Sequence, residues 1–259
     1  MTSSTWQSWP PCPARLDATS DVVHVIAFPL DVPERSLHRI DGCLTEAERV
    51  RAARFVDAVH RRRWIAGRAT LRTMLADCVG AEPAEIPIEY GRFGKPELRE
   101  PYQALTFNLS HSGPLALLAI AWGRDVGVDV EAISHRIDWP AVAARFFSRA
   151  ERDELARLPA ARQARAFFAC WSRKEAYLKA RGAGLSWEPA AFSVTVAPDA
   201  PPKLCDASPG STWQLTDVCV DDAFAACIAW NGRPARIVPC RATALWAREA
   251  WPSPDPANV

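Results

Sequence analysis

The sequence carries almost no excess charge and lacks the segments that direct a chain into or across a membrane. Its 31 Lys and Arg residues balance 30 Asp and Glu residues, so bulk electrostatics gives no reason to expect nucleic acid or an acidic membrane as a partner. The longest uninterrupted apolar runs, such as residues 115–122, are far shorter than a membrane span. The N-terminus has no basic segment followed by a long apolar one, as a signal peptide would. We therefore expect a soluble, cytoplasmic protein that binds neither nucleic acid nor membrane.

The eight cysteines lack the spacings that are typical of metal-binding or redox sites. The sequence contains no C-x-x-C pair and no His/Cys zinc spacing. Cys170 and Cys227 lie in apolar runs, and we expect them to be small core residues. A disulfide framework is not expected in a chain of 259 residues. We therefore predict reduced thiols.

Hydrophobic periodicity and turn residues predict alternating helices and strands. Helices are expected from Thr45, over 58–79 and over 139–181, and strands are expected over 22–28, 115–122, 126–131, 191–197, 212–220 and 223–231. The Pro-, Ser- and Trp-rich residues 1–20 are expected to be an irregular lead-in. A loop marked by Gly and Pro covers 91–98, and the Pro-rich end is expected to be a frayed tail.

The same short pattern occurs twice along the chain. "LTEAER" (44–49) is similar to "FSRAER" (147–152), and "WIAGRATL" (64–71) is similar to "WSRKEAYL" (171–178). The offsets of 103 and 107 residues predict a duplication with a four-residue insertion, in which Arg68 takes the place of Glu175. The alternative is that two amphipathic helices share letters by chance. A true duplication would produce two similar lobes with a cleft between them.

Three carboxylates are candidate ligands of a hard divalent cation. In "VGVDVE" (126–131) the alternation of a strand puts Asp129 and Glu131 on one face, where they repel each other unless a cation or solvent separates them. Glu175 lies beside the apolar stripe of a predicted helix and is a candidate third ligand. Two alternatives stay open: a solvated strand face, and an ordinary surface pair of Glu175 with Lys179 one turn later.

Several cations and hydroxyls are candidates for binding phosphate. "FNLSHSG" (107–113) presents Ser110, His111 and Ser112 in a polar turn. A serine hydrolase is disfavoured because G-x-S-x-G is missing, and a plain turn histidine is the alternative to phosphate binding. Lysine is scarce, yet Lys95 lies in the "FGKP" loop. The arginines of the first helices, including Arg51 and Arg63, suit either phosphate or a solvated face. The chain has neither a Walker loop nor G-x-G-x-x-G.

"FGKP", "FNLSHSG", "GVDVE", "RFFSRAE" and "WSRKEAYLKARGAGLS", in this order and at this spacing, resemble the surfactin-synthetase-activating type of 4′-phosphopantetheinyl transferase. The resemblance extends from about Leu44 to about Val196. It implies a pseudo-dimeric α/β fold whose two similar lobes are related by pseudo-two-fold symmetry, with the active site in the cleft between them. We expect a lead-in over 1–20, an N-terminal lobe over 21–122, a C-terminal lobe with the metal site over 123–247, and a flexible tail over 248–259.

The resemblance also implies an activity: transfer of phosphopantetheine from coenzyme A to a serine of an apo acyl or peptidyl carrier protein, releasing adenosine 3′,5′-bisphosphate. The reaction would depend on Mg²⁺, with Mn²⁺ as an alternative. Carried over by motif, the metal ligands are Asp129, Glu131 and Glu175, the catalytic residues are Glu175, Lys179 and Asp129, and the coenzyme contacts are Arg51, Arg63, Lys95, Ser110, His111, Asp129, Lys174 and Lys179. The spacing leaves open whether Lys174 touches the coenzyme or only fixes Glu175. Glu151 matches an acidic position near the metal, or is a helix cap.

Two other functions remain alternatives at this point. One is a different Mg²⁺-dependent enzyme that acts on a coenzyme A-like pyrophosphate, and the other is a non-catalytic module that binds carrier proteins. The proton acceptor is either Glu175 or a water on the metal. The two-lobed form suggests a monomer that serves polyketide, non-ribosomal peptide or fatty-acid carriers, with secondary metabolism favoured. The sequence does not identify the client.

Overall fold

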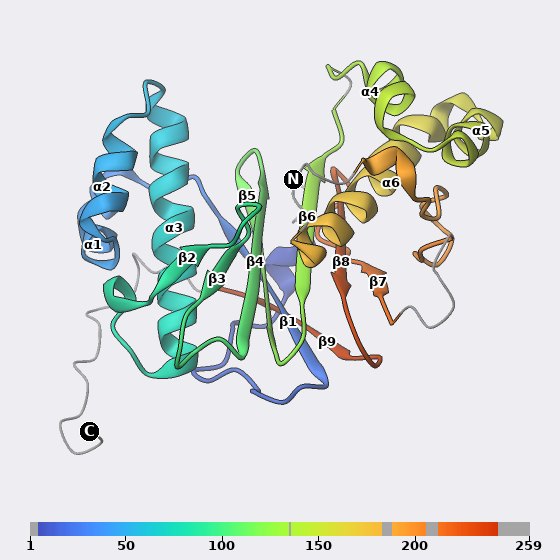
Figure 1. Ribbon diagram of the computed structural model, residues 1–259. Helices are drawn as coiled ribbons and strands as arrows, with labels where there is room; N and C mark the ends of the chain where they lie inside the picture. Colours follow the sequence, from blue (N-terminus) through green and yellow to red (C-terminus); the bar gives the residue numbers. More distant parts are fainter. Residues whose placement is uncertain (1–4, 135, 183–187, 206–211, 243–259) are drawn as a thin grey trace.

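The computed structural model describes residues 5–134, 136–182, 188–205 and 212–242. Its elements form two α/β lobes that follow each other along the chain (Figure 1). The first lobe contains β1 (Val22–Pro29), α1 (Glu34–Ile40), α2 (Glu46–Ala53), α3 (Ala58–Val79), β2 (Ile88–Tyr90), β3 (Pro96–Leu98), β4 (Leu105–Ser112) and β5 (Leu115–Trp122). The second contains β6 (Val126–Ala132), α4 (Trp139–Phe146), α5 (Arg149–Arg157), α6 (Ala160–Arg181), β7 (Gln214–Asp217) and β8 (Phe224–Trp230), and β9 (Arg236–Arg241) follows.

The two main sheets are packed between two long helices. The first sheet has the order β4-β5-β1-β9 and the second β6-β8-β7, while β2 and β3 form a separate hairpin. One face of the first sheet, including Ile26 and Phe28, packs with α3 in one apolar cluster. Its other face, including Val25, shares a cluster with Val128 of the second sheet, whose opposite face packs on α6. The layers therefore run helix, sheet, sheet, helix, with α3 and α6 outermost (Figure 1).

The internal duplication is confirmed by topology. The order strand, long helix, strand, strand recurs as β1-α3-β4-β5 and β6-α6-β7-β8, with corresponding strands in corresponding places in each sheet. Both long helices have 22 residues. Each ends at a glycine in the left-handed conformation, Gly80 and Gly182, which favours residues without a Cβ. The short helices α2 and α5 both begin with a capping box, Thr45–Glu48 and Ser148–Glu151.

The alignment predicted for the second half of the repeat was wrong. Helices α3 and α6 begin, end and are capped 102 residues apart, so no four-residue insertion separates the copies. At this offset Thr73, and not Arg68, takes the place of Glu175. The match between "WIAGRATL" and "WSRKEAYL" is shifted by more than one helical turn from the structural alignment. It arises because two amphipathic helices repeat similar residues at helical intervals.

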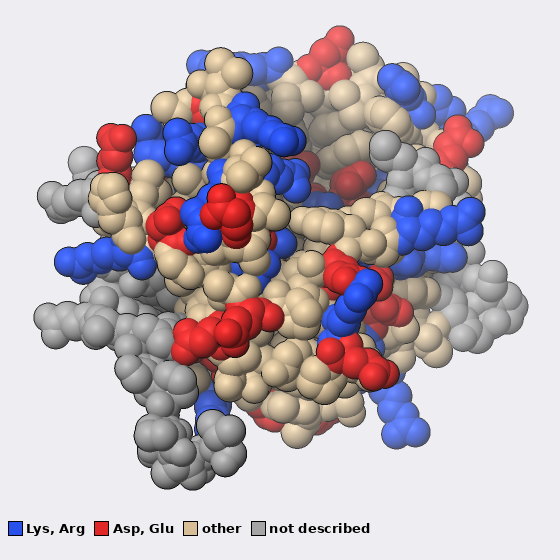
Figure 2. All heavy atoms as spheres, turned by 60° about the vertical axis from the view of Figure 1, so that its left-hand side comes forward, with Lys and Arg blue, Asp and Glu red and all other residues tan. Residues whose placement is uncertain are grey.

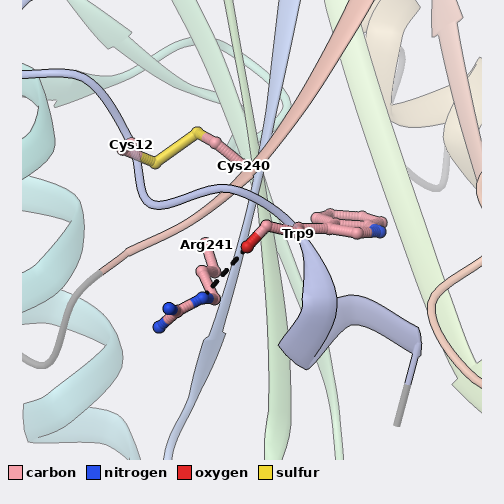
Figure 3. Close-up of a disulfide and its surroundings, with 4 residues drawn as sticks. All are labelled: Trp9, Cys12, Cys240 and Arg241. Carbon is pink, nitrogen blue, oxygen red and sulfur yellow. Dashed lines mark hydrogen bonds between the residues drawn. A yellow bond between two sulfur atoms is a disulfide. The ribbon is translucent and has the colours of Figure 1, made fainter.

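The N-terminal segment and β9 tie the lobes together, contrary to the sequence prediction. β9 pairs in parallel with β1 of the first sheet, although residues 123–247 were assigned to the second lobe. Cys12 is disulfide-bonded to Cys240 of β9 with a Cα–Cα distance of 5.0 Å (Figure 3), so the expectation of reduced thiols was wrong for this pair. In the described part of the lead-in, 5–20, the 3₁₀ turn Thr5–Ser8 is followed by largely irregular chain, and Trp9 O accepts a hydrogen bond from Arg241 Nε. Cys170 and Cys227 are buried, as predicted.

The helical region predicted over 139–181 is confirmed, and it consists of three helices, because extended Phe147 and Pro159 separate α4, α5 and α6. The strand expected over 191–197 is only an isolated bridge at Val194, because Glu151 Oε1 accepts the Val194 N–H and Arg173 donates to nearby carbonyls. The predicted tail, 248–259, lies outside the described residues. Among those residues, no helix is both long and apolar enough to cross a membrane.

Candidate active site

The carboxylates of β6 lie where the edges of the two sheets meet. Val126, Val128 and Val130 point into the core between the sheets, as strand alternation predicts. Asp129 and Glu131 therefore point the other way, and Asp129 is only 2% exposed. β6 approaches α6 so closely at Gly127 that a Cβ there would lie 2.2 Å from the Ala176 carbonyl oxygen. The glycine of "GVDVE" thus allows the carboxylate strand to pack directly against α6.

Each β6 carboxylate is held by groups from neighbouring elements. Asp129 Oδ1 accepts hydrogen bonds from Lys179 Nζ at 2.5 Å and from Ser110 Oγ at 3.0 Å. Its Oδ2 is buried and has no hydrogen-bond partner among the described residues. Glu131 accepts from the Trp171 indole Nε1 at 3.2 Å and from Ser112 Oγ at 3.3 Å. The two lobes therefore meet at these two side chains, because Ser110 and Ser112 belong to β4.

Glu175 extends from α6 beside the same seam, the line along which β4 and β6 meet at the edges of the two sheets, and it is half-buried. Among the described residues it makes no hydrogen bond and no ion pair, so the predicted surface pair with Lys179 is replaced by the pair of Lys179 with Asp129. Glu175 and Lys179 line a pocket of about 290 Å³ with Lys95, Phe93 and other residues. A carboxylate and an ammonium group thus face one hollow between the lobes.

Desolvation raises the pKa values of all three carboxyls. Burial raises the pKa of Asp129, against the opposing effect of the Lys179 charge. Burial and then the charge of Asp129 raise the pKa of Glu131 to about 7. Burial and again Asp129 raise the pKa of Glu175. Each carboxyl is more stable when protonated or paired with a cation than it would be in water.

The donor set is suitable for a hard cation, but its members are not gathered around one point. No group of three or more His, Cys, Asp or Glu side chains in the described part of the chain is arranged to hold a metal ion. The seam nevertheless offers carboxylate oxygens, which Mg²⁺ and Mn²⁺ prefer, and the unpartnered Asp129 Oδ2 is one of them. The residues fit a divalent cation in kind, and Lys179 occupies part of the space beside Asp129.

The predicted phosphate-binding cations make different contacts in the structure. His111 is exposed; desolvation and then the positive charges of Lys179 and Arg63 lower its pKa. Lys95 Nζ donates to the Ala180 carbonyl at the end of α6, at 2.7 Å. Arg63 forms a two-pronged ion pair with Asp31, and Arg51 lies over the Trp64 ring.

Basic side chains border a hollow on the side of the molecule that carries α1–α3. In Figure 2, Lys and Arg gather on the upper part of this face, and acidic atoms are visible inside the hollow. The positive charges that act on His111, those of Lys179, Arg63 and His60, come from both lobes. Such a border suits an anionic ligand.

Comparison with known proteins decides the family. One family model, described as "4′-phosphopantetheinyl transferase, N-terminal", matches residues 33–122, and another, "4′-phosphopantetheinyl transferase superfamily", matches residues 125–229. The 4′-phosphopantetheinyl transferase HetI of Nostoc sp. is 38% identical over 227 residues, which cover 87% of this chain and 94% of HetI. The chain belongs to the 4′-phosphopantetheinyl transferase family.

A second relative agrees with this assignment. A 4′-phosphopantetheinyl transferase of Bacillus pumilus is 35% identical over 165 residues, covering 64% of this chain and 69% of the relative. A crystal structure of a holo-(acyl-carrier-protein) synthase from Bacillus anthracis in complex with CoA is 21% identical, covers 41% of this chain and 94% of its own, and has a TM-score of 0.36. That structural likeness is too low to carry any part of the assignment.

Lys174 of the transferase does not lie in its cleft, which contradicts the predicted coenzyme contact. The side chain is completely buried, and its Nζ lies 2.7 and 2.8 Å from the two carboxylate oxygens of Glu151. It also donates to the Phe192 carbonyl at 2.6 Å and lies 4.2 Å from the centre of that ring. Glu151 in turn completes the capping box of α5. Of the two roles proposed for Glu151, the structure shows the helix cap.

Sequence reasoning missed two contributors to the transferase seam, Asn108 and the indole of Trp171, and it gave Ser112 no role. Trp171 packs against the apolar cluster of α6, but its Nε1 also donates to Glu131. Asn108 and Ser112 flank Ser110 at alternate positions of β4. The polar turn predicted for "FNLSHSG" was wrong, because residues 105–112 form β4. Short polar residues at every second position, 108, 110 and 112, were the available signal for this strand.

Proposed function

We propose that this transferase moves 4′-phosphopantetheine from coenzyme A to a serine of an apo acyl or peptidyl carrier protein, releasing adenosine 3′,5′-bisphosphate, and that it needs Mg²⁺ or Mn²⁺. The observation that carries the proposal is the set of three desolvated carboxyls beside Lys179 at the meeting of the lobes. A cation bound with the substrate would balance the negative charge of these carboxyls. The phosphates of the substrate would in turn be attracted by the basic side chains that border the hollow.

Asp129, Glu131 and Glu175 would hold the cation, with Asp129 offering its unpartnered Oδ2. The bound cation would neutralise charge that develops on the pyrophosphate oxygens. Lys179 is 29% exposed at its side chain, so it can move from Asp129 to these oxygens when a cation takes its place. His111, Ser110 and Lys95 are the proposed phosphate contacts, together with Arg63 and Arg51 of the first lobe.

Glu175 is the proposed acceptor of the serine proton. It has no hydrogen-bond partner among the described residues, and its raised pKa makes it a stronger base than an exposed carboxylate. Its side chain faces the pocket, where a hydroxyl can approach. Asp129 suits this task less well because its unpartnered Oδ2 is buried, and Glu131 because donors already engage both of its oxygens.

The direct test combines the protein, Mg²⁺, coenzyme A and several apo carrier proteins, and measures the carrier masses. We expect a gain of one phosphopantetheine group on at least one carrier, and its loss on removal of the cation with a chelator. Glu175→Gln should abolish the gain without unfolding the protein. The matched control is Glu46→Gln, at a side chain that is 79% exposed on α2. No gain on any carrier refutes the proposal, and full activity of Glu175→Gln refutes the role of that residue.

A single chain supplies both sides of the proposed site, β4 from one lobe and β6 with α6 from the other. We therefore propose that the transferase acts as a monomer. We also propose that it is cytoplasmic and serves secondary metabolism, with carriers of polyketide, peptide or fatty-acid synthesis as clients. Rates across a panel of carriers identify the client. Sedimentation at assay concentration tests the monomer.

A further inference from the structure

β4 and β6 are edge strands of different sheets, yet they lie side by side. Alternate N–H groups of β6 point toward β4, where no backbone partner completes a ladder. Side chains of β4 accept them instead: Val128 N–H bonds to Asn108 Oδ1 at 2.9 Å, Val130 N–H to Ser110 Oγ at 3.4 Å, and Ala132 N–H to Ser112 Oγ at 2.9 Å. Such edge donors would otherwise be unsatisfied in a buried seam.

Two rungs of this side-chain ladder also hold the carboxylates. Ser110 Oγ accepts the N–H of Val130 and bonds to the carboxylate of the preceding residue, Asp129. Ser112 Oγ repeats the arrangement with the Ala132 N–H and Glu131. A hydroxyl has one proton to donate and two lone pairs to accept with, so each serine can engage backbone and carboxylate together. The distance of each carboxylate from the first lobe is thereby tied to the backbone of β6.

We propose that Asn108, Ser110 and Ser112 are positioning residues. They hold β6 in a fixed position relative to β4, and so place the Asp129 and Glu131 carboxylates where they bind the divalent cation. This rests on the proposed function, in which these carboxylates are cation ligands. Ser112 is the most informative rung because it is only half-buried, so its hydroxyl can be removed without opening the core. Groups that orient metal ligands typically contribute about 10–100-fold to metal affinity.

The test compares Ser112→Ala and Ser112→Thr with wild type. Binding of Mn²⁺, followed by its electron paramagnetic resonance signal with and without coenzyme A, should weaken about tenfold in Ser112→Ala and recover in Ser112→Thr. Amide hydrogen exchange in peptides that cover β6 should quicken only in Ser112→Ala. The KM for Mg²⁺ should rise, while kcat at saturating Mg²⁺ stays near that of wild type.

The matched control is Thr106→Val on the same strand, whose hydroxyl bonds to the Ala121 and Arg124 carbonyls and not to β6. It should leave Mn²⁺ binding unchanged. If Ser112→Ala binds Mn²⁺ and exchanges the amides of β6 as wild type does, the positioning role of the ladder is refuted, while the proposed cation site is not affected. An equal loss in Ser112→Thr would also overturn it, because the hydroxyl is then irrelevant. Failure of wild type to bind Mn²⁺ would instead overturn the proposed cation site, and with it this inference.

Discussion

Replacing Lys174 by methionine is expected to lower the free energy of unfolding by about 3–5 kcal/mol, because a buried carboxylate then loses its countercharge. The side chains of Lys174 and Glu151 are 0% and 1% exposed. Glu151 retains N–H donors from Ser148 at 2.7 Å and Val194 at 2.8 Å, but neither carries a charge. The Phe192 carbonyl also loses its donor. Urea unfolding followed by tryptophan fluorescence measures the change.

The second variant separates charge from packing. Adding Glu151→Gln to Lys174→Met should restore part of the lost stability, since the amide keeps an oxygen for the backbone donors and removes the unpaired charge. The control is the exposed pair of Arg149 with Asp153 on α5, whose side chains are 90% and 54% exposed. Arg149→Met should change stability by less than about 1 kcal/mol, as exposed pairs contribute little.

A Lys174→Met protein as stable as wild type would refute the buried-pair argument. If the KM for coenzyme A also rises while stability is unchanged, the result would show that Lys174 contacts the coenzyme and does not stabilise the fold. Equal destabilisation by the double and single variants would show that packing, and not the unpaired charge, sets the cost.

Three further predictions concern the framework around the site. Gly127→Ala should cost about 3 kcal/mol or more in urea unfolding, because its Cβ would lie 2.2 Å from the Ala176 backbone oxygen; normal stability would contradict this packing. Burial raises the pKa of Glu48, but hydrogen bonds from two arginines and a cap lower it overall, below 4.5. Glu48→Gln should therefore be least stable relative to wild type above about pH 5, and the difference should shrink as pH falls from the ordinary pKa of 4.5 through the lowered pKa of the folded state; a pH-independent difference would argue against it. Cys12→Ser should lower stability by about 2–4 kcal/mol in oxidising buffer and by little in reducing buffer, and equal loss in both would contradict a stabilising disulfide.

Local signals explain why much of the fold was predictable. The capping box at Thr45, the strand alternation of "VGVDVE" and the glycine at the end of α3 each depend on a few adjacent residues. The faces of Asp129 and Glu131 follow from alternation alone. What brings Ser110 against Asp129 is different, because it depends on how the edges of two sheets meet.

Long-range pairing explains the errors. β9 lies beside β1 although more than 200 residues separate Val22 from Arg236, and nothing within residues 236–241 signals which sheet they join. The bond of Cys12 to Cys240 depends on that same pairing. The burial of Lys174 was hidden for a similar reason, since its partner Glu151 lies on another helix.

The corrected repeat explains what the two adjacent charges of "KE" do. Successive residues of a helix point about 100° apart, so Lys174 faces α5 while Glu175 faces the seam. At the offset of 102 residues, Lys174 corresponds to Arg72, which bonds to Glu48 of the other capping box at 2.6 Å.

Both cations also donate to the main chain that follows their helix, Arg72 to the Pro83 carbonyl and Lys174 to that of Phe192. The ion pair thus occurs in both lobes. Glu175, in contrast, has no carboxylate counterpart in the first lobe, where Thr73 lies at the corresponding position. An interaction shared by a lobe with the carboxylates and a lobe without them stabilises the lobe itself, so we assign Lys174 to the scaffold and Glu175 to the chemistry.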